Sequence, residues 1–550
     1  MTVLYHRPRP GRYRLARGVH MRGAYLICDY PLRALRPGAT ALRLLAHCAE
    51  EHTCAELAAL LNLPVKRVET LCKQLYWKGL LDAGPQLPPE TWPGVSIIIP
   101  TYNRALQLER CLSSLLQVDY PPACLEIIVV DDASSDETGA TLERFVEKCK
   151  TKGIPLRIVR HTGRRGVAIS RNSGAEQARM EVLAFIDSDC VATSAWLKEL
   201  TPALQDQSTG AVGGMIRARE RRSTLGKYED TRSSLFKGAR PQQVRLEGPL
   251  TYLPTSNLLI RRSEWQKLGG FALLTHGEDV DFCHRLLLSG SAVRYEPRGI
   301  VLHDYRTGIK GFSKTRISYA SSEAVLLQHH PTERRVLLLP PEQATFAALL
   351  IGGLWRLAWS WIDGNRNKQS LFRFILAALL ILFSARKRLA AVRRQRIPIN
   401  PFTILRATLR GHLAYVYHLC RHLTRYYTLP MLIAGIIFPP LLLLSLILCT
   451  IVIGVDYTRL RPRMAFGRFA LCSLLDDCAY EIGVALGCIK QRTWKPLLPV
   501  IKCRDQHALR VFDLQALMHK PLGGRAAAVT DAILPAAAAR AAAHVAIKSE

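Results

Sequence analysis

The sequence lacks the patterns of a secreted, disulfide-rich or zinc-binding protein. Its 550 residues include fifteen cysteines, an odd number, and no two of them form a C-x-x-C pair. Residues 1–10 contain no apolar run followed by a small-residue cleavage site, so no signal peptide is predicted. No internal repeat is present. We therefore expect reduced thiols and a functional domain that stays in the cytosol.

Acidic residues are scarce compared with basic ones. Lysine and arginine number 75 against 44 aspartates and glutamates, which gives a formal net charge of +31. Basic clusters at residues 386–396, 421–425 and 459–463 each adjoin apolar sequence. This arrangement suits an anionic membrane surface better than a nucleic acid. We therefore expect a membrane partner, with nucleic acid as the weaker alternative.

Several buried-strand patterns end in polar residues. Apolar runs lie within residues 93–103, 125–136 and 182–186, and the first two are followed by helical patterns at 105–117 and 137–150. Alternating strands and helices predict an α/β fold with a mostly parallel sheet. Ligands bind such sheets beyond the carboxyl ends of the strands. The polar residues that follow the strands are therefore candidates for a binding site.

Two carboxylates, Asp187 and Asp189, follow the run at 182–186. In an extended chain, residues two positions apart project to the same side, so the two carboxylates are expected to converge. Hard oxygen ligands at a strand end suit Mg²⁺ or Mn²⁺, which takes its other ligands from water and substrate phosphates. The alternative is that Asp-Ser-Asp only closes the strand with a turn.

Two further segments carry candidate site residues. Residues 160–178 combine glycines with Arg164, Arg165 and Arg171 ahead of a small-residue helix, a pattern that could bind phosphate or form a basic surface loop. Residues 275–290 begin a helix with three acids, Glu278, Asp279 and Asp281. Acids also favour the first turn of a helix for electrostatic reasons alone, and Asp281 is the candidate for that role.

These motifs together resemble the family 2 glycosyltransferases of the GT-A fold. The resemblance spans residues 93–303 and rests on SIIIPTYNR (96–104), IIVVDDASSDET (127–138), RNSGAEQA (171–178), the D-x-D, TSNLLIRR (255–262), GEDVDFCHRL (277–286) and VLHDY (301–305). It implies a nucleotide-sugar donor, a divalent cation and direct displacement with inversion at the sugar carbon.

The resemblance also implies roles for individual residues. Thr101, Asn103 and Asp132 would hold the nucleoside, and Asp187 and Asp189 the metal and donor, with Arg164 and Arg171 toward its phosphates. His303 would complete the metal site, or only cap a strand. Asp279 would be the general base, and Glu278 would lie on the acceptor side. A carboxylate suits the base because an acceptor hydroxyl is a weak nucleophile until its proton is removed.

A closer resemblance, over almost the whole chain, is to the glycosyltransferases of mycofactocin biosynthesis. It rests on residues 277–286, on RYEP at 294–297, on HDYRT at 303–307 and on a late stretch near 476–502. The sequence DDCAY at 476–480 departs from the family's pattern. The resemblance implies transfer of a hexose, in particular glucose from UDP-glucose, onto a peptide-derived redox cofactor or its precursor at the bacterial cytoplasmic membrane.

Residues 1–85 read as a separate unit. Two strands within 13–30 are followed by helices at 40–49, at 54–61 after the capping box Thr53-x-x-Glu56, and after Pro64 to residue 78. This winged-helix pattern resembles peptide-binding domains of the PqqD type, which add a peptide as a strand to a sheet edge. The alternatives are a nucleic-acid reader that uses Lys66, Arg67, Lys73 and Lys78, and a purely structural domain.

The remaining divisions are a linker at 86–93, a GT-A domain at 94–335, a helical membrane-associated region at 336–505 and a basic, alanine-rich tail at 506–550. Residues 431–455 contain no charge and are long enough to cross a bilayer. Pro439 and Pro440 interrupt them, so two interfacial segments are the alternative. The shorter runs at 346–361 and 374–384 are expected to form a hairpin or lie at the interface.

A second function class is a membrane polysaccharide or glycolipid glycosyltransferase. Processive synthases of that class carry a Q-x-x-R-W signature, and none of the eight tryptophans here lies in that context. Transfer to a peptide-derived small molecule is therefore the leading prediction. A binding protein with an inactive transferase fold is disfavoured because all the acidic positions are present.

Overall fold

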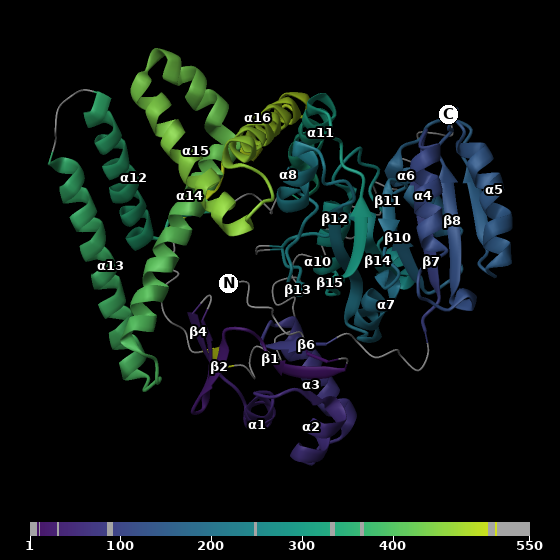
Figure 1. Ribbon diagram of the computed structural model, residues 1–550, viewed down its shortest axis with the longest axis horizontal. Coiled ribbons are helices and arrows are strands. Elements are labelled where there is room, and N and C mark those ends of the chain that lie inside the picture. Colours follow the sequence, from purple (N-terminus) through teal and green to yellow (C-terminus); the bar gives the residue numbers. More distant parts are fainter. Residues whose placement is uncertain are drawn as a thin grey trace.

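A computed structural model describes residues 8–9, 11–29, 32–84, 92–246, 250–330, 336–362, 368–503 and 512–513. Most of the predicted linker and of the predicted tail lie outside the described residues. Figure 1 shows an N-terminal unit below a central sheet domain, with long helices to one side.

The N-terminal unit combines two small sheets with three helices. Its elements are β1 (Arg12–Leu15), β2 (Val19–Arg22), β3 (Tyr25–Asp29), β4 (Leu32–Arg36), α1 (Ala39–His47), β5 (His52–Thr53), α2 (Cys54–Leu61), α3 (Val65–Trp77) and β6 (Leu81–Ala83). The predicted capping box is confirmed, since the Thr53 hydroxyl accepts a hydrogen bond from the Glu56 amide and the Glu56 carboxylate accepts one from the Thr53 amide. The start of α3 after Pro64 is also confirmed.

The central domain is built on a nine-stranded mixed sheet. Its strands are β7 (Val95–Thr101), β8 (Leu125–Asp131), β9 (Leu156–Arg160), β10 (Val182–Phe185), β11 (Cys190–Ala192), β12 (Thr209–Ala218), β13 (Gln242–Gln243), β14 (Leu258–Arg261) and β15 (Ala292–His303). The path runs β11-β15-β12-β14-β10-β7-β8-β9, with β13 beside β15.

The prediction of a mostly parallel sheet holds for only part of this sheet. Strands β10, β7, β8 and β9 are parallel neighbours, but β14 runs antiparallel to both β10 and β12, and β11 and β13 run antiparallel to β15. The prediction extended the strand and helix alternation of residues 93–185 to the whole domain. The later strands do not follow that alternation, and antiparallel neighbours need no crossover helix.

Helices cover both faces of the sheet and form two cores. The helices are α4 (Ala105–Leu115), α5 (Thr138–Thr151), α6 (Val167–Glu176), α7 (Trp196–Leu200), α8 (Thr224–Arg232), α9 (Arg262–Lys267) and α10 (Glu278–Leu288). Leu112 and Phe145 pack with Trp196 on one face. On the other face Ala175 packs with Phe282. The polar strand ends are therefore held by a core that is closed on both sides.

The N-terminal unit is attached to the central domain through α3 and the RYEP segment of β15. The Tyr76 hydroxyl donates a 2.7 Å hydrogen bond to Glu296, which is buried, and the Arg294 guanidinium lies 4.9 Å from the centre of the Trp77 ring. Tyr76 and Trp77 belong to the same core as the central sheet. A role for RYEP as a joint between the two units follows from these contacts.

The C-terminal region is helical. It comprises α11 (Ile309–His329), β16 (Val336–Leu338), α12 (Pro341–Ile362), α13 (Gln369–Arg394), α14 (Pro401–Ile437), α15 (Pro439–Leu460), α16 (Phe466–Lys490), β17 (Val500–Lys502) and β18 (Phe512–Asp513). Helices α12 and α13 pack together, and Phe374 lies against Gly353. The predicted interruption of the apolar stretch 431–455 by Pro439 and Pro440 is confirmed, because one helix ends at Ile437 and a new one begins at Pro439.

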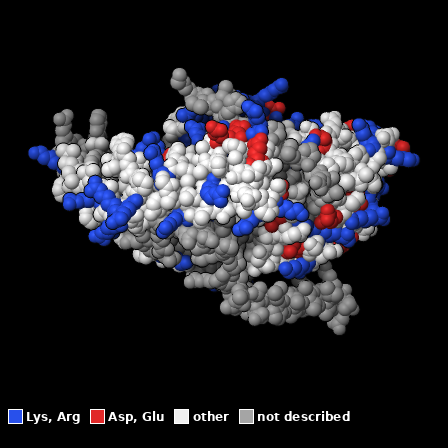
Figure 2. Space-filling view, turned by 90° about the horizontal axis from the view of Figure 1, so that it is seen from below, with Lys and Arg blue, Asp and Glu red and all other residues white. Residues whose placement is uncertain are grey.

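Within the described residues, α15 is the one helix whose length and mean hydropathy would allow it to cross a membrane. One third of its most apolar window is buried in the structure. Large apolar side chains are also exposed along α13, namely Leu371, Phe372, Ile375, Leu379, Leu382 and Phe383. On the face shown in Figure 2, the end of the molecule at the left carries basic and uncharged atoms with almost no acidic ones.

Candidate active site

The polar ends of β7, β8 and β10 lie side by side because these strands are adjacent and parallel. Thr101 ends β7 and is buried, and its hydroxyl has no hydrogen-bond partner within the described part of the chain. Asn103 follows with a left-handed backbone (φ 49°), and its side-chain oxygen accepts a 2.8 Å hydrogen bond from the Ser135 amide. The sheet edge therefore brings these two predicted donor-binding residues together.

Arg164 closes one side of this edge. Its guanidinium lies 4.4 Å from the centre of the Tyr102 ring, and both side chains are exposed. A cation over an aromatic face is stabilised by the electron-rich ring. Arg164 thus presents an exposed positive charge over Tyr102, next to Thr101 and Asn103, and this charge could bind a phosphate.

Asp132 is engaged with the protein itself. Its carboxylate accepts hydrogen bonds of 2.8 Å from the amides of Arg165 and Gly166 and faces His161 at 2.8 Å. Burial opposes its ionisation, but these hydrogen bonds hold the pKa of Asp132 below its usual range. The amides of residues 165 and 166, just ahead of α6, are therefore occupied by the Asp132 carboxylate.

Asp187 and Asp189 do not lie on an extended strand. Strand β10 ends at Phe185, and the Cys190 amide donates to the Asp187 carbonyl across a turn. The predicted strand alternation is therefore wrong for these two residues, which follow the strand in a turn. Asp187 pairs with Arg171 at 2.6 Å, whereas Asp189 pairs with Arg104 at 2.5 Å. The turn delivers the two carboxylates to different partners.

Arg171 links two acids inside the protein. Its side chain is 4% exposed and donates to Asp187 at 2.6 Å and to Glu278 at 2.5 Å. Burial opposes the charge of Arg171, but the two carboxylates raise its pKa. Arg171 and Glu278 are thus buried together in a salt bridge, and their predicted roles toward a donor phosphate and the acceptor stay predictions.

A potential metal-binding group forms where β11 pairs with β15. Cys190 lies opposite His303 in that pairing, and ligand atoms of Asp189, Cys190 and His303 lie within 4.8 Å of one another. The His303 Nε2 is 3.5 Å from Asp189, and its buried Nδ1 has no partner within the described residues. Asp189 and His303 thus fit a cation such as Mn²⁺, whereas hard cations do not favour the sulfur of Cys190.

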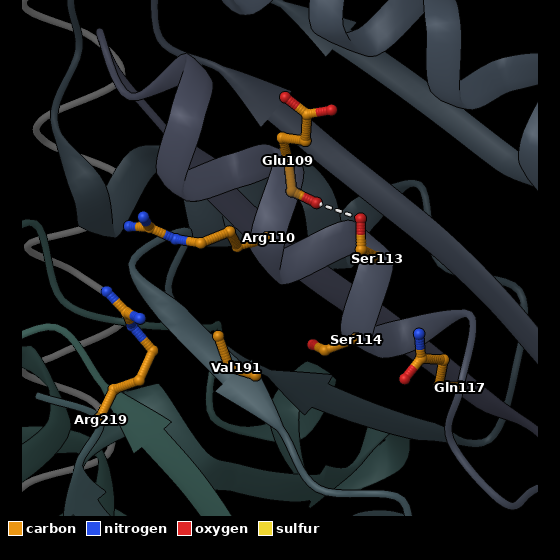
Figure 3. Close-up of a pocket in the computed structure, with 7 residues that line it drawn as sticks. All are labelled: Glu109, Arg110, Ser113, Ser114, Gln117, Val191 and Arg219. Carbon is orange, nitrogen blue, oxygen red and sulfur yellow. Dashed lines mark hydrogen bonds between the residues drawn. The ribbon is translucent and has the colours of Figure 1, made fainter.

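Asp304 holds the end of β15 in place beside His303. It accepts hydrogen bonds from Arg110 at 2.5 Å and from Arg219. Figure 3 shows these two arginines at one side of a pocket of about 350 Å³ floored by Val191 of β11. The pocket therefore adjoins the metal-binding group, but its two cations are already paired.

Asp279 lies in the first turn of α10 with a partly exposed side chain. Burial raises the pKa of Asp279 to about 7, the Glu278 carboxylate acts in the same direction, and Arg171 and Lys237 limit the rise. The Lys237 ammonium lies 3.6 Å from the centre of the Tyr252 ring. Burial lowers the pKa of Lys237 to about 8, against the attraction of Asp279. A carboxyl that titrates near neutral pH is suited to proton transfer.

Asp281, two residues further along the same helix, has a structural environment. It accepts a 2.8 Å hydrogen bond from Arg285 and lies 2.9 Å from His330. Burial opposes its ionisation, but these partners lower the pKa of Asp281. Glu278 and Asp281 are therefore both paired with basic residues, whereas Asp279 has no basic hydrogen-bond partner in the described chain.

Residues 96–268 match the family described as glycosyl transferase family 2. A pre-mycofactocin glycosyltransferase from Mycobacterium tuberculosis is 28% identical over 77% of this chain and 86% of its own length. A poly-beta-1,6-N-acetyl-D-glucosamine synthase from Staphylococcus epidermidis is 27% identical over 44% of this chain and 57% of its own length.

Among solved structures, a mannosyltransferase from Pyrobaculum calidifontis in complex with GDP-Man and Mn²⁺ is 20% identical. The match covers 60% of this chain and 89% of that chain, with a TM-score of 0.37.

Proposed function

We propose that this chain, which contains a family 2 glycosyltransferase domain of α/β fold, transfers a hexose from a nucleotide sugar to a peptide-derived acceptor, in particular glucose from UDP-glucose onto a redox cofactor or its precursor. The observation that carries the proposal is the contact of Arg171 with both Asp187, after the end of β10, and Glu278, the chain neighbour of Asp279. The similarity to a pre-mycofactocin glycosyltransferase over most of both chains supports the acceptor class.

Asp279 is proposed as the general base. It lies at the start of a helix, where backbone amides and the buried Arg171 stabilise negative charge nearby, and its carboxylate can accept a proton from an acceptor hydroxyl. Direct attack of that hydroxyl on the sugar carbon breaks the bond to the diphosphate, which leaves with the bonding electrons. This mechanism inverts the sugar carbon.

Donor binding is proposed at Thr101, Asn103 and Arg164. Asp189 and His303 would hold a divalent cation, which supplies charge stabilisation to the departing diphosphate when bound. Asp187 would contribute by fixing Arg171, so that the turn carrying Asp189 keeps its conformation. Asp132 would contribute indirectly, because its three contacts with residues 161, 165 and 166 hold that loop in place.

The direct test is product analysis. Purified protein should be incubated with a panel of nucleotide sugars and a peptide-derived acceptor, and the products weighed by mass spectrometry. Addition of one or a few hexose units to the acceptor supports the proposal. A long polymer formed without that acceptor would favour the alternative, a polysaccharide synthase. The similarity to a poly-beta-1,6-N-acetyl-D-glucosamine synthase is the reason for testing this alternative.

The N-terminal unit is proposed to be a winged-helix, PqqD-like domain that recruits the peptide-derived acceptor. Strand β18 pairs in parallel with β4 at one edge of its sheet, and β2 is the other edge, at which a peptide would be added. A nucleic-acid reader is less well supported, because α3 packs against the central domain through Tyr76 and Trp77. The Lys73 ammonium also reaches Gln205 of that domain.

We expect deletion of residues 1–85 to raise the acceptor concentration needed for half-maximal rate while sparing donor hydrolysis by water. The reason is that every proposed catalytic residue follows Pro93. Calorimetry on the full chain and on the deletion variant, with the peptide and with duplex DNA as ligands, measures the recruitment itself. Loss of DNA binding without loss of peptide binding would reverse the assignment.

The C-terminal region is proposed to attach the protein to the bacterial cytoplasmic membrane, with the catalytic domain in the cytosol. We expect the protein in the membrane fraction, resistant to high salt and released by detergent. Burial of apolar surface contributes about 0.8 kcal/mol per methylene, and each basic residue at an anionic leaflet adds roughly 1 kcal/mol that salt screens. Fractionation of the full chain in low salt, high salt and detergent checks this. Release by salt alone would indicate purely electrostatic attachment.

A further inference from the structure

Four arginines from three helices surround a cavity of about 210 Å³ between the central domain and the C-terminal helices. Arg232 ends α8, Arg316 lies on α11, and Arg421 and Arg425 lie one turn apart on α14. Ser233, Ser234 and Asp476 complete the lining. Ser234 is exposed, so the cavity reaches the surface there. A water molecule occupies about 30 Å³ in the liquid, so a small oxyanion fits with several waters.

Buried acids stand behind these arginines and fix them. Arg316 pairs with Asp476 at 3.0 Å and with Glu229 at 2.8 Å, and Arg421 pairs with Asp477 at 2.7 Å. Arg232 lies 3.2 Å from Asp456. These four carboxylates are 7% exposed or less, whereas Arg421 and Arg425 are 23% and 20% exposed. The four arginines line the cavity together with Asp476, whereas the other three carboxylates are not part of its lining.

Arg421 and Arg425 each keep N–H donors that their acid partners do not use. A guanidinium carries five N–H donors. Within the described residues, Arg421 and Arg425 contact their acids through Nη1 alone. The Arg425 guanidinium lies 3.4 Å from the centre of the Tyr480 ring, which further fixes its plane. Pre-aligned forks of this kind suit the oxygens of a phosphate.

We propose that this cavity is a phosphate-binding site, which takes either a free phosphate or the phosphate of a lipid headgroup. A bound phosphate would accept hydrogen bonds from α8 and from α14 at once, and would so join the catalytic domain to the C-terminal helices. The site also explains the DDCAY segment, since Asp476 and Asp477 orient the arginines and Tyr480 supports one of them. This inference does not depend on the sugar or the acceptor.

The cavity lies close to the catalytic acids along α11. Arg316 and Tyr319 are three residues apart and so share a face of that helix. Burial raises the pKa of Tyr319, and the charges of Asp187, Asp189 and Asp279 act in the same direction.

The test compares anion binding by detergent-solubilised full-length protein and its variants. Orthophosphate is titrated by calorimetry, and vesicles of phosphatidylglycerol are compared with vesicles of phosphatidylcholine. The variants are the double change Arg421→Gln with Arg425→Gln, the cavity-filling Ser234→Trp, which leaves every ion pair in place, and the matched control Arg410→Gln, an exposed arginine on the same helix. UDP is titrated in parallel.

We expect the double variant and Ser234→Trp to weaken phosphate binding at least tenfold, the Arg410→Gln control to retain it, and UDP binding to persist in all. If the unmodified protein binds phosphatidylglycerol vesicles but not orthophosphate, and Ser234→Trp weakens the vesicle binding, the ligand is the lipid headgroup and the proposal is supported. Binding of neither probe, equal losses in the control, or a matching loss of UDP binding would overturn it. Failure of glycosyl transfer would leave these results unchanged, so the two proposals are tested separately.

Discussion

Asp279→Asn should lower the rate of sugar transfer by roughly 10²-fold to 10⁴-fold, the usual contribution of a general base. The substitution keeps the size of the side chain and removes its basicity, so binding of the nucleotide sugar should persist. Release of nucleoside diphosphate, measured under single-turnover conditions, reports the chemical step. Transfer within about threefold of the unmodified protein would show that Asp279 is not the base.

The pH dependence sharpens this test. Because burial and Glu278 raise the pKa of Asp279 to about 7, the base is protonated below that pH and ionised above it. The rate should therefore rise with pH through an acid limb near 7, and Asp279→Asn should remove that limb. Asp281→Asn is the matched control on the same helix. It breaks the contacts with Arg285 and His330, so it should lower thermal stability while the acid limb remains.

Local patterns predicted much of the fold. The capping box at Thr53 and Glu56 and the helix predicted at 105–117 involve contacts between residues a few positions apart, which a single segment specifies by itself. The paired prolines at 439 and 440 also predicted the helix break, since proline is well placed in the first turn of a new helix. The mixed half of the sheet was missed because strand direction depends on connections far apart in the chain.

The partners of the candidate site residues could not be predicted in the same way. Arg104 and Asp189 are 85 positions apart, and Arg171 and Glu278 are 107 positions apart. A sequence shows that charges exist but not which of them meet inside a fold. Arg104 could have been suspected from its place at the end of SIIIPTYNR. Lys237, which acts electrostatically on Asp279, lies in a loop with no periodic pattern and gave no signal.

Removal of divalent cations should abolish sugar transfer, and Mg²⁺ or Mn²⁺ should restore it. The cation would stabilise charge on the departing diphosphate, a contribution of several kcal/mol that side chains alone do not replace. Diphosphate release before and after exhaustive chelation, followed by readdition of each metal, measures this. Full activity in the chelated protein would contradict the prediction and leave the Asp-Ser-Asp segment as a turn.

Three substitutions identify the ligands independently of activity. Asp189→Ala and His303→Ala should each weaken Mn²⁺ binding by at least about tenfold in calorimetry, since even residues that only support a metal ligand contribute that much. Cys190→Ala should leave Mn²⁺ binding unchanged, although its sulfur lies in the same group of atoms, because hard cations favour oxygen and nitrogen over sulfur. A large loss of binding in Cys190→Ala, together with a preference for Zn²⁺, would instead assign the group to a softer metal with a structural role.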